Sequence, residues 1–234
     1  MKIVILCGGK GTRLGADTKT VPKPMVKIGK DPILVHILKL YERYGFKDFI
    51  LALGYKGEYI ERFFRKRKTK LNIRLVKTGK NTLTGTRLLK LKKYLSNEEN
   101  FMLTYGDGLS NQDLSKLLAF HKNHKKIGTM TVVRPPARFG EVNLAGNNVK
   151  NFKEKPQIKS GWINGGFFVF NKKFFKFLKK DSNEMLERNS LESLVKKRQL
   201  KAFKHKGFWQ CMDTPRDKEF LKKLIKLKNA PWLN

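Results

Sequence analysis

Residues 2–14 read KIVILCGGKGTRL, in which an apolar run from Ile3 to Cys7 leads directly into a loop rich in glycine. A short apolar run with β-branched residues predicts a buried strand over residues 2–7. The run is too short for a secretion signal, and glycines follow it where such a signal has its cleavage site. The start of the chain therefore predicts a sheet strand that ends in a glycine-rich loop, as in α/β proteins.

The loop concentrates glycine, because Gly8, Gly9 and Gly11 fall within four residues. Glycine lets backbone amides approach an anion closely, and Arg13 adds a planar fork that suits phosphate oxygens. The spacing matches neither the P-loop nor the dinucleotide-binding motif. A tight turn at the strand end would also account for the glycines, but it gives Arg13 no role. We therefore expect this loop to bind phosphate.

Strand-like and helix-like segments alternate along the rest of the chain. Predicted strands cover residues 48–53, 72–76, 101–105, 128–134, 141–144, 149–153, 163–170 and 200–204. Predicted helices begin at Asp31-Pro32 and after the loop 77–86, and cover 57–66, 113–124, 172–180, 190–197 and 216–228. We expect Asp31 to cap the first helix and Gly45 to end it. The pattern predicts a single domain over residues 1–234 with an α/β, Rossmann-like fold. A mostly parallel mixed sheet would be flanked by helices, with a small α+β extension after residues 135–136.

The composition of the 234 residues limits the class of protein. Hydrophobic residues make up 40% of the chain, which is enough for a substantial core. No apolar stretch approaches the roughly 20 residues that span a bilayer. Two cysteines, Cys7 and Cys211, do not make a disulfide framework. We therefore expect a cytoplasmic protein without membrane insertion.

The chain is strongly basic, with 52 lysines and arginines against 19 acidic residues and a net charge of +33. Such a charge can serve nucleic-acid binding, because cationic side chains neutralise phosphates. Most of the excess is lysine spread along helical segments, which is also typical of a solvated surface. No nucleic-acid recognition motif accompanies the charge, so we expect no specific nucleic-acid partner.

A second motif, Val21-Pro22-Lys23-Pro24-Met25, follows the glycine-rich loop. Prolines on both sides of Lys23 restrict the local backbone to extended conformations. This rigidity suits a lysine that neutralises a reacting phosphate without losing much rotational freedom. Taken alone, the motif is equally typical of a stiff loop.

Two carboxylates, Asp107 and Asp213, stand at places where a sheet binds ligands. Asp107 lies between two glycines at the end of a predicted strand, and Asp213 lies in a loop that leads into the last helix. Two oxygen donors of this kind are what Mg²⁺ needs when phosphates and water fill its other positions. A Gly-Asp-Gly turn and a helix cap are the alternative roles.

Histidine and cysteine add little chemistry to these motifs. His121 and His124 lie three residues apart on a predicted helix, but no third metal ligand suggests itself, so we expect exposed histidines. Cys7 and Cys211 flank the proposed site, where we expect them to pack rather than to act as nucleophiles.

Together, the Gly-Gly-x-Gly-Thr-Arg-Leu loop and the Pro-Lys-Pro motif resemble those of the sugar-1-phosphate nucleotidylyltransferase family. Further segments follow in the order of one branch of this family, the glucose-1-phosphate cytidylyltransferases. They are residues 101–108, 139–140, 152–156, 163–168 and 207–214. The resemblance covers nearly the whole chain. It implies that CTP and glucose-1-phosphate react to CDP-glucose and pyrophosphate with Mg²⁺ as cofactor.

The resemblance also implies roles for individual residues. The implied catalytic residues are Arg13, Lys23 and Asp107, and the implied Mg²⁺ ligands are Asp107 and Asp213. The implied nucleotide-binding residues are Leu6, Cys7, Gly8, Gly9, Lys10, Gly11, Thr12, Arg13, Lys23, Thr82, Arg87 and Gly106. The implied sugar-phosphate-binding residues of the C-terminal extension are Glu154, Lys155, Asn164 and Gly165. Taken without the resemblance, residues 154–156 are also typical of a surface loop and residues 164–166 of a turn.

The chain departs from the branch in a few places. The stretch between Arg67 and Gly79 is much shorter than in the cytidylyltransferases, which carry there a long segment associated with subunit contacts and lying near the nucleotide. Formation of a homo-oligomer and the choice of CTP over UTP, dTTP or GTP are therefore left open. Thr86 replaces a usual glycine, and Cys7 a usual alanine. A non-catalytic nucleotide-binding protein is the alternative from another class, but it has no need of two metal-binding carboxylates.

Overall fold

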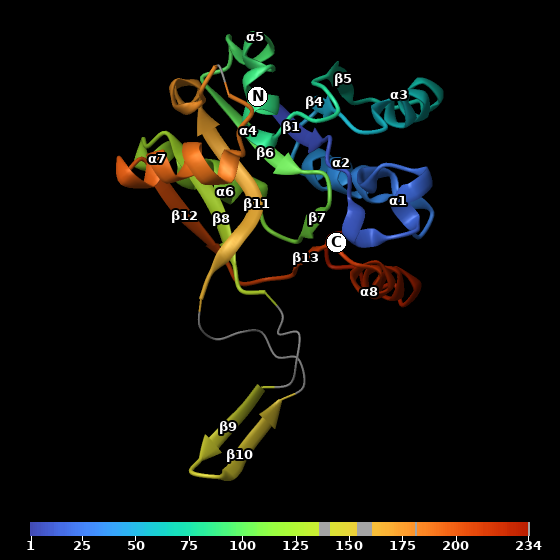
Figure 1. Ribbon diagram of the computed structural model, residues 1–234, viewed down its shortest axis with the longest axis vertical. Helices are drawn as coiled ribbons and strands as arrows, with labels where there is room; N and C mark the ends of the chain where they lie inside the picture. Colours follow the sequence, from blue (N-terminus) through green and yellow to red (C-terminus); the bar gives the residue numbers. More distant parts are fainter. Residues whose placement is uncertain (136–140, 154–160, 181, 234) are drawn as a thin grey trace.

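The computed structural model describes residues 1–135, 141–153, 161–180 and 182–233, and a seven-stranded sheet forms its centre (Figure 1). The strand order is β12-β8-β11-β6-β1-β4-β5. The bounds of these strands are β1 Lys2–Cys7, β4 Asp48–Leu53, β5 Asn72–Lys77, β6 Asn100–Tyr105, β8 Gly128–Val133, β11 Ile163–Asn171 and β12 Leu200–His205. Only β11 among these seven runs antiparallel to its neighbours. The predicted mostly parallel mixed sheet is confirmed.

Successive side chains of β1 enter two different apolar cores. Ile3, Ile5 and Cys7 belong to one buried cluster, whereas Val4 and Leu6 belong to the other. A strand that is buried on both faces reads as a continuous apolar run, which is the pattern at the start of this chain. The position of β1 in the middle of the sheet follows from this pattern.

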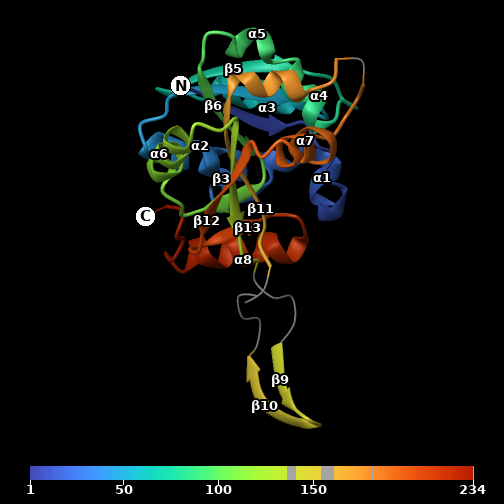
Figure 2. The same ribbon diagram turned by 90° about the vertical axis from the view of Figure 1, so that its left-hand side faces the viewer.

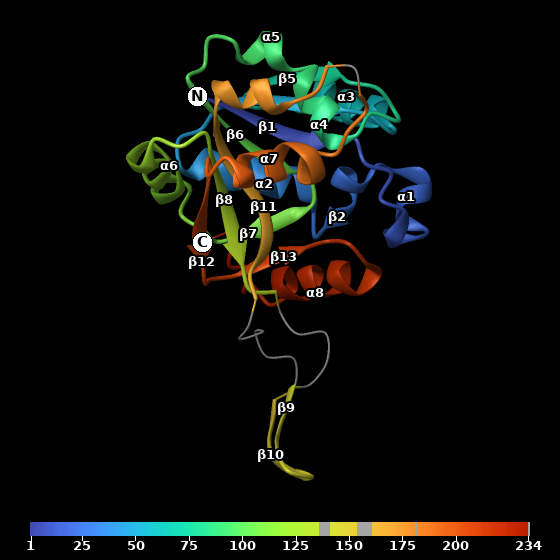
Figure 3. The ribbon, with the colours of Figure 1, turned by 60° about the vertical axis from the view of Figure 1, so that its left-hand side comes forward.

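Helices cover both faces of the sheet (Figures 2 and 3). On the face of Ile3 lie α2 Ile33–Arg43, α3 Gly57–Lys66, α6 Leu114–His124 and α8 Pro215–Lys226. On the face of Val4 lie α4 Thr84–Leu89, α5 Lys92–Leu95, the 3₁₀ helix η3 Lys172–Phe177, the π-helical turn η4 Leu186–Ser190 and α7 Leu191–Lys196. The predicted helix over residues 172–180 is therefore a shorter 3₁₀ helix. Among the described residues, no helix is long and apolar enough to span a bilayer.

Short helical turns and strands lie in the segments that connect the strands of the main sheet with the larger helices. They are η1 Thr12–Leu14, α1 Asp17–Thr20, η2 Lys23–Met25, β2 Lys27–Ile28, β3 Asp31–Pro32, β7 Gly108–Ser110 and β13 Trp209–Cys211. The last hairpin, β9 Glu141–Ala145 with β10 Asn148–Lys153, extends away from the rest of the molecule (Figure 1). The mixed character predicted for the second half of the chain thus comes from this hairpin and from the antiparallel strand β11.

The predicted capping role of Asp31 is wrong. The cap position of α2 is Pro32, whose ψ of 153° is extended, and no side chain caps the helix. The carboxylate of Asp31 instead accepts hydrogen bonds from Lys39 at 2.7 Å and from Arg67 at 3.1 Å. Two nearby cations bind a carboxylate more strongly than the helix amides do, because these contacts join opposite full charges.

His121 and His124 form a hydrogen-bonded chain with the sheet rather than lying exposed. The backbone amide of Lys126 donates to Nδ1 of His124 at 2.9 Å, so Nε2 of His124 carries the proton and donates to Thr129 Oγ1 at 2.7 Å. The Thr129 hydroxyl then donates to Nδ1 of His121 at 2.8 Å, and Nε2 of His121 donates to Asn100 Oδ1 at 3.2 Å. Every contact is satisfied only when both imidazoles are neutral.

Acidification is expected to destabilise the fold through His121. Burial, together with the neighbouring His124, lowers the pKa of His121 from 6.5 to about 4. The unfolded chain therefore binds a proton first, so the stabilisation is complete above pH 6.5 and is lost as the pH falls toward 4. This difference of one bound proton lowers the free energy of unfolding by about 2 kcal/mol between pH 6.5 and 5. Urea unfolding at a series of pH values measures this slope.

The His121→Gln variant is the control, because a glutamine amide can accept from Thr129 and donate to Asn100 as the neutral imidazole does. We expect similar stability to the parent chain at pH 7.5 and a flatter profile between pH 7 and 5. An unchanged slope in this variant would assign the acid sensitivity to other groups.

Candidate active site

A pair of short antiparallel strands brings distant segments together at the carboxyl ends of the sheet strands. Strands β7 and β13 pair antiparallel, and the backbone amide of Met212 donates to the carbonyl of Asp107 at 2.8 Å. Asp107 precedes β7 and Asp213 follows β13, so both carboxylates reach the carboxyl end of β1. There the amide of Gly106 donates to the carbonyl of Leu6 at 3.2 Å.

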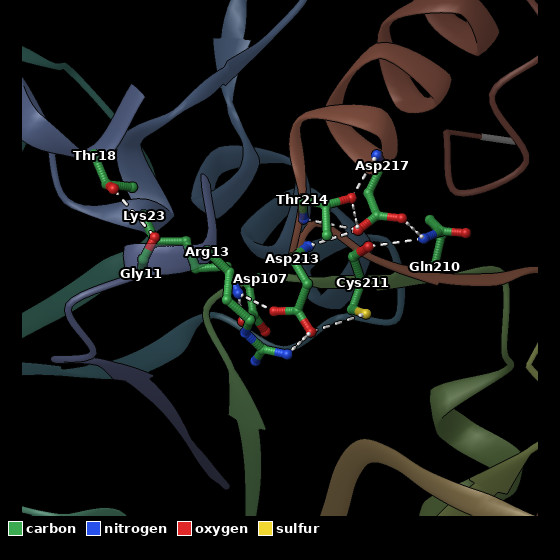
Figure 4. A network of polar contacts seen from close by, with 10 residues as sticks. All are labelled: Gly11, Arg13, Thr18, Lys23, Asp107, Gln210, Cys211, Asp213, Thr214 and Asp217. Atoms are coloured by element: carbon green, nitrogen blue, oxygen red, sulfur yellow. Dashed lines mark hydrogen bonds and ion pairs between the residues drawn. The ribbon is translucent and has the colours of Figure 1, made fainter. Parts of the chain in front are cut away.

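Lys23 lies between these two carboxylates (Figure 4). Its Nζ is 2.5 Å from Asp107 Oδ2 and 2.5 Å from Asp213 Oδ1. The two oxygens are consequently no more than 5.0 Å apart, twice that distance. The Lys23 side chain is only 10% exposed. Three residues that lie far apart in the sequence therefore form one compact cluster of charge.

The charges of this cluster stabilise one another. Burial by itself would lower the pKa of Lys23, but the two carboxylates outweigh burial and raise it. Burial by itself would raise the pKa of Asp213, but Lys23 and Arg13 outweigh burial and lower it. Near neutral pH Lys23 is therefore a cation and Asp213 an anion.

The glycine-rich loop packs against the stem of Lys23. Gly11 has a positive φ of 67°, and a Cβ atom there would lie 2.8 Å from Cβ of Lys23. The hydroxyl of Thr18 donates to the carbonyl of Gly11 at 3.1 Å and holds the loop in place (Figure 4). Arg13 contacts Asp213 at 3.2 Å, but its side chain stays 71% exposed. Its guanidinium therefore remains accessible to a ligand.

Arg13, Lys23, Asp107 and Asp213 line a cavity of about 960 Å³. The predicted site residues along its wall are Leu6, Gly8, Gly9, Arg13, Lys23, Thr82, Arg87, Gly106, Asp107, Asn164, Gly165 and Asp213. Cys7, Lys10, Gly11 and Thr12 belong to the same strand and loop but do not line the cavity. The predicted sugar-phosphate residues Glu154 and Lys155 lie outside the described residues.

Arg87 connects the loops around the cavity. Its guanidinium donates to the carbonyls of Leu53 at 2.8 Å, Thr82 at 2.6 Å and Gly79 at 3.2 Å. A Cβ atom on Gly8 would lie 2.0 Å from the Arg87 guanidinium carbon, so any side chain there would displace the guanidinium. The contacts of Arg87 are those of a residue that shapes the cavity, and its contact with a nucleotide remains a prediction.

One wall of the cavity comes from a segment that carries no sequence motif. Residues 182–187 dock on α4 through two threonine hydroxyls. Thr86 Oγ1 accepts from the amide of Glu184 and donates to the carbonyl of Ser182, both at 2.8 Å. Thr84 Oγ1 accepts from the amide of Leu186 and donates to the carboxylate of Glu187, also at 2.8 Å. Thr86, which stands where a glycine is usual, thus has a defined structural role.

Further residues complete the cavity wall, and of these Tyr105 was not predicted from the sequence. Tyr105 donates to the Glu187 carboxylate, and the indole of Trp209 donates to the carbonyl of Gly165 at 2.7 Å. The apolar wall residues with large exposed fractions are Leu83, Ile163, Met185 and Phe220. Apolar side chains beside a few polar groups in a cavity are typical of a site for an organic ligand. For Trp209 the sequence favours packing beside a strand, with shaping of the sugar pocket as the alternative.

The cysteines are unsuited to nucleophilic catalysis. Burial raises the pKa of the Cys7 thiol, and burial together with Asp213 raises that of Cys211 to about 12. The thiolate is the nucleophilic form, and neither cysteine populates it near neutral pH. This agrees with the packing roles expected from the sequence.

Residues 2–221 match the protein family described as nucleotidyl transferase. The chain belongs to this family. It is 41% identical to the glucose-1-phosphate cytidylyltransferase of Salmonella typhimurium over 254 aligned residues, which cover 99% of this chain and 98% of that relative. The family resemblance seen in the sequence is therefore confirmed.

Two other similarities place this nucleotidyl transferase more broadly. The mannose-1-phosphate guanylyltransferase catalytic subunit beta of Danio rerio is 32% identical over 93% of this chain and 62% of its own length. The crystal structure of HddC from Yersinia pseudotuberculosis superposes with a TM-score of 0.74 at 24% identity, covering 96% of this chain and 99% of that one. This structural likeness supports the fold.

The Arg87→Lys variant is expected to lose about 2–4 kcal/mol of unfolding free energy. A lysine ammonium cannot reach several carbonyls that a planar guanidinium spans, so buried acceptors are left without donors. Urea unfolding measures the loss. Arg65→Lys on the exposed surface of α3 is the matched control, and equal stability of both variants would contradict the connecting role of Arg87.

Proposed function

We propose that this nucleotidyl transferase transfers the cytidylyl group of CTP to glucose-1-phosphate and releases pyrophosphate. The observation that carries the proposal is the cluster of Lys23, Asp107 and Asp213 on the wall of a cavity that also contains the glycine-rich loop. The near full-length similarity to the Salmonella cytidylyltransferase supports the choice of both substrates.

In the proposed reaction, a phosphate oxygen of glucose-1-phosphate attacks the α-phosphorus of CTP in line with the leaving group. One P–O bond forms to the sugar phosphate, the bond between the α-phosphorus and the bridging oxygen breaks, and pyrophosphate departs with the electron pair. The sugar phosphate is already ionised at neutral pH, so the reaction requires no protein nucleophile. Catalysis therefore depends on positioning and on neutralisation of charge.

The residues of the cavity have different roles in this positioning and neutralisation of charge. Backbone amides of Gly8 and Gly9 together with the exposed Arg13 bind the triphosphate. Lys23 stabilises the negative charge that develops at the α-phosphate. Asn164 and Gly165 contact the sugar phosphate from β11, where Trp209 holds the backbone of Gly165. Glu154 and Lys155 remain proposed sugar-phosphate ligands on the strength of the family resemblance alone.

The carboxylate pair fits Mg²⁺ as the cofactor. Among the described residues, no group of three histidines, cysteines or acidic residues could hold a metal ion by itself. Mg²⁺ is usually bound by one or two carboxylates while substrate phosphates and water complete its shell. Asp107 and Asp213 provide such a pair, and the chemistry supplied by the bound ion is neutralisation of phosphate charge.

Lys23→Ala and Asp213→Asn are expected to lower kcat/KM about 10²–10³-fold, the usual loss when one electrostatic contact to a reacting group is removed. Pyrophosphate release from CTP, glucose-1-phosphate and Mg²⁺ measures the rate, and circular dichroism checks the fold. Lys122→Ala, on the exposed side of α6, is the control and should keep the parent rate. Near-normal turnover in either site variant would refute the assignment.

The same assay, run with each nucleoside triphosphate, determines which base the protein prefers. CTP should give a kcat/KM at least about tenfold above those of UTP, dTTP and GTP, because a single well-placed contact contributes about 1.4 kcal/mol. Faster turnover with GTP would align the chain with the guanylyltransferase relatives instead. Absence of pyrophosphate with every triphosphate would favour a binding protein.

A further inference from the structure

The Lys23 ammonium occupies the space where a metal ion would have to lie. A cation that bridged the two carboxylates through Asp107 Oδ2 and Asp213 Oδ1 would need the space next to these two oxygens, because Mg²⁺ binds oxygen at about 2.1 Å. The Nζ atom lies 2.5 Å from these same two oxygens. The ammonium and the metal ion therefore cannot occupy this place together.

We propose that Lys23 is an internal counter-ion that blocks the metal site until nucleotide binds. Each ion that the carboxylates bind displaces the ammonium, and a displaced ammonium in a largely buried position needs another anion. Resting on the proposed function, the phosphates of the nucleotide are that anion. Metal and nucleotide consequently bind with positive coupling, and the nucleotide-free protein binds the metal weakly.

The stem of Lys23 is built for such a displacement. Lys23 begins the 3₁₀ helix η2 and does not have the extended backbone predicted from its flanking prolines. The helix and the fixed φ of Pro24 restrict the backbone, so the ammonium moves by rotation of its side chain. The stem packs beside Gly11, and a Cβ atom on Gly11 would lie 3.4 Å from Cδ of Lys23. An ammonium that leaves the carboxylates therefore stays next to the loop proposed to bind the triphosphate.

Arg13 is the second cation that this arrangement engages. It contacts Oδ2 of Asp213, while Lys23 contacts Oδ1 of the same carboxylate. Because the Arg13 side chain is largely exposed, water screens this contact and its loss costs little. Lys23, which is largely buried and contacts both carboxylates, is the residue that controls access of the metal.

The decisive measurement is Mn²⁺ binding to the nucleotide-free protein, followed by electron paramagnetic resonance. Lys23→Met removes the ammonium and keeps a stem of similar length, so Mn²⁺ should bind about tenfold more tightly or better. Lys122→Met removes the same charge from the exposed side of α6 and should change the affinity less than about twofold. Equal affinities in the parent chain and Lys23→Met would overturn the proposal.

A second measurement uses the unaltered protein and holds even if Lys23→Met fails to fold. A lysine-acylating reagent is applied with and without saturating Mn²⁺, and modification is read by mass spectrometry. Mn²⁺ should raise the modification rate of Lys23 several-fold relative to that of Lys122, because the displaced ammonium loses its carboxylate partners. An unchanged or lower rate at Lys23 would show that the metal does not displace it.

Both measurements omit nucleotide and sugar phosphate, so they separate two kinds of failure. Absence of cytidylyl transfer with tighter Mn²⁺ binding in Lys23→Met would refute the proposed reaction and leave the counter-ion role intact. Normal transfer with unchanged Mn²⁺ affinity would refute the counter-ion role alone.

Discussion

The contact of one ammonium with two carboxylates constrains the loops around the cavity of this molecule. Lys23, Asp107 and Asp213 come from three separate parts of the chain, and each must arrive with its charge satisfied because the lysine is largely buried. A buried charge without a partner costs several kcal/mol, so the loops that carry these residues cannot shift independently. The glycine-rich loop, the Pro-Lys-Pro motif and the β7–β13 pair are thereby held in one arrangement around the cavity.

The sheet beneath the cavity provides the rigidity that this arrangement needs. Strand β1 is buried on both faces, with alternate side chains in two separate cores, so its carboxyl end is a fixed point. Arg87 connects the end of β4 with the loop between β5 and α4 by donating to three backbone carbonyls of these two segments. Two threonine hydroxyls attach residues 182–187 as a further wall. Charge, backbone hydrogen bonding and apolar packing thus determine the same geometry by independent means.

Much of the fold could be predicted from the sequence because its signals are local. The apolar runs at residues 48–53 and 101–105 and the helical spacing over residues 57–66 appear in the structure with the predicted bounds or within one residue of them. Asp31 was mispredicted because cations from residues 39 and 67 compete with the helix amides, and their proximity depends on the tertiary fold.

The same limit applies to the candidate site. Motifs identify Lys23, Asp107 and Asp213 as chemically suited residues, and the structure brings them together. Nothing in the sequence near Glu184 or Met185 signals a cavity wall, because their role arises from hydroxyls of a distant helix. The nucleotide contact of Arg87 stays a prediction. Its hydrogen bonds to backbone carbonyls could not be predicted from the sequence, because every residue has the same backbone carbonyl.

The antiparallel strand β11 has a consequence for synthesis of the protein. Strand β8 pairs only with β11 and β12 in the described part of the chain, and both follow it in sequence. A ribosome-bound chain that ends before residue 163 therefore exposes β8 with two open edges, and such edges favour pairing with other chains.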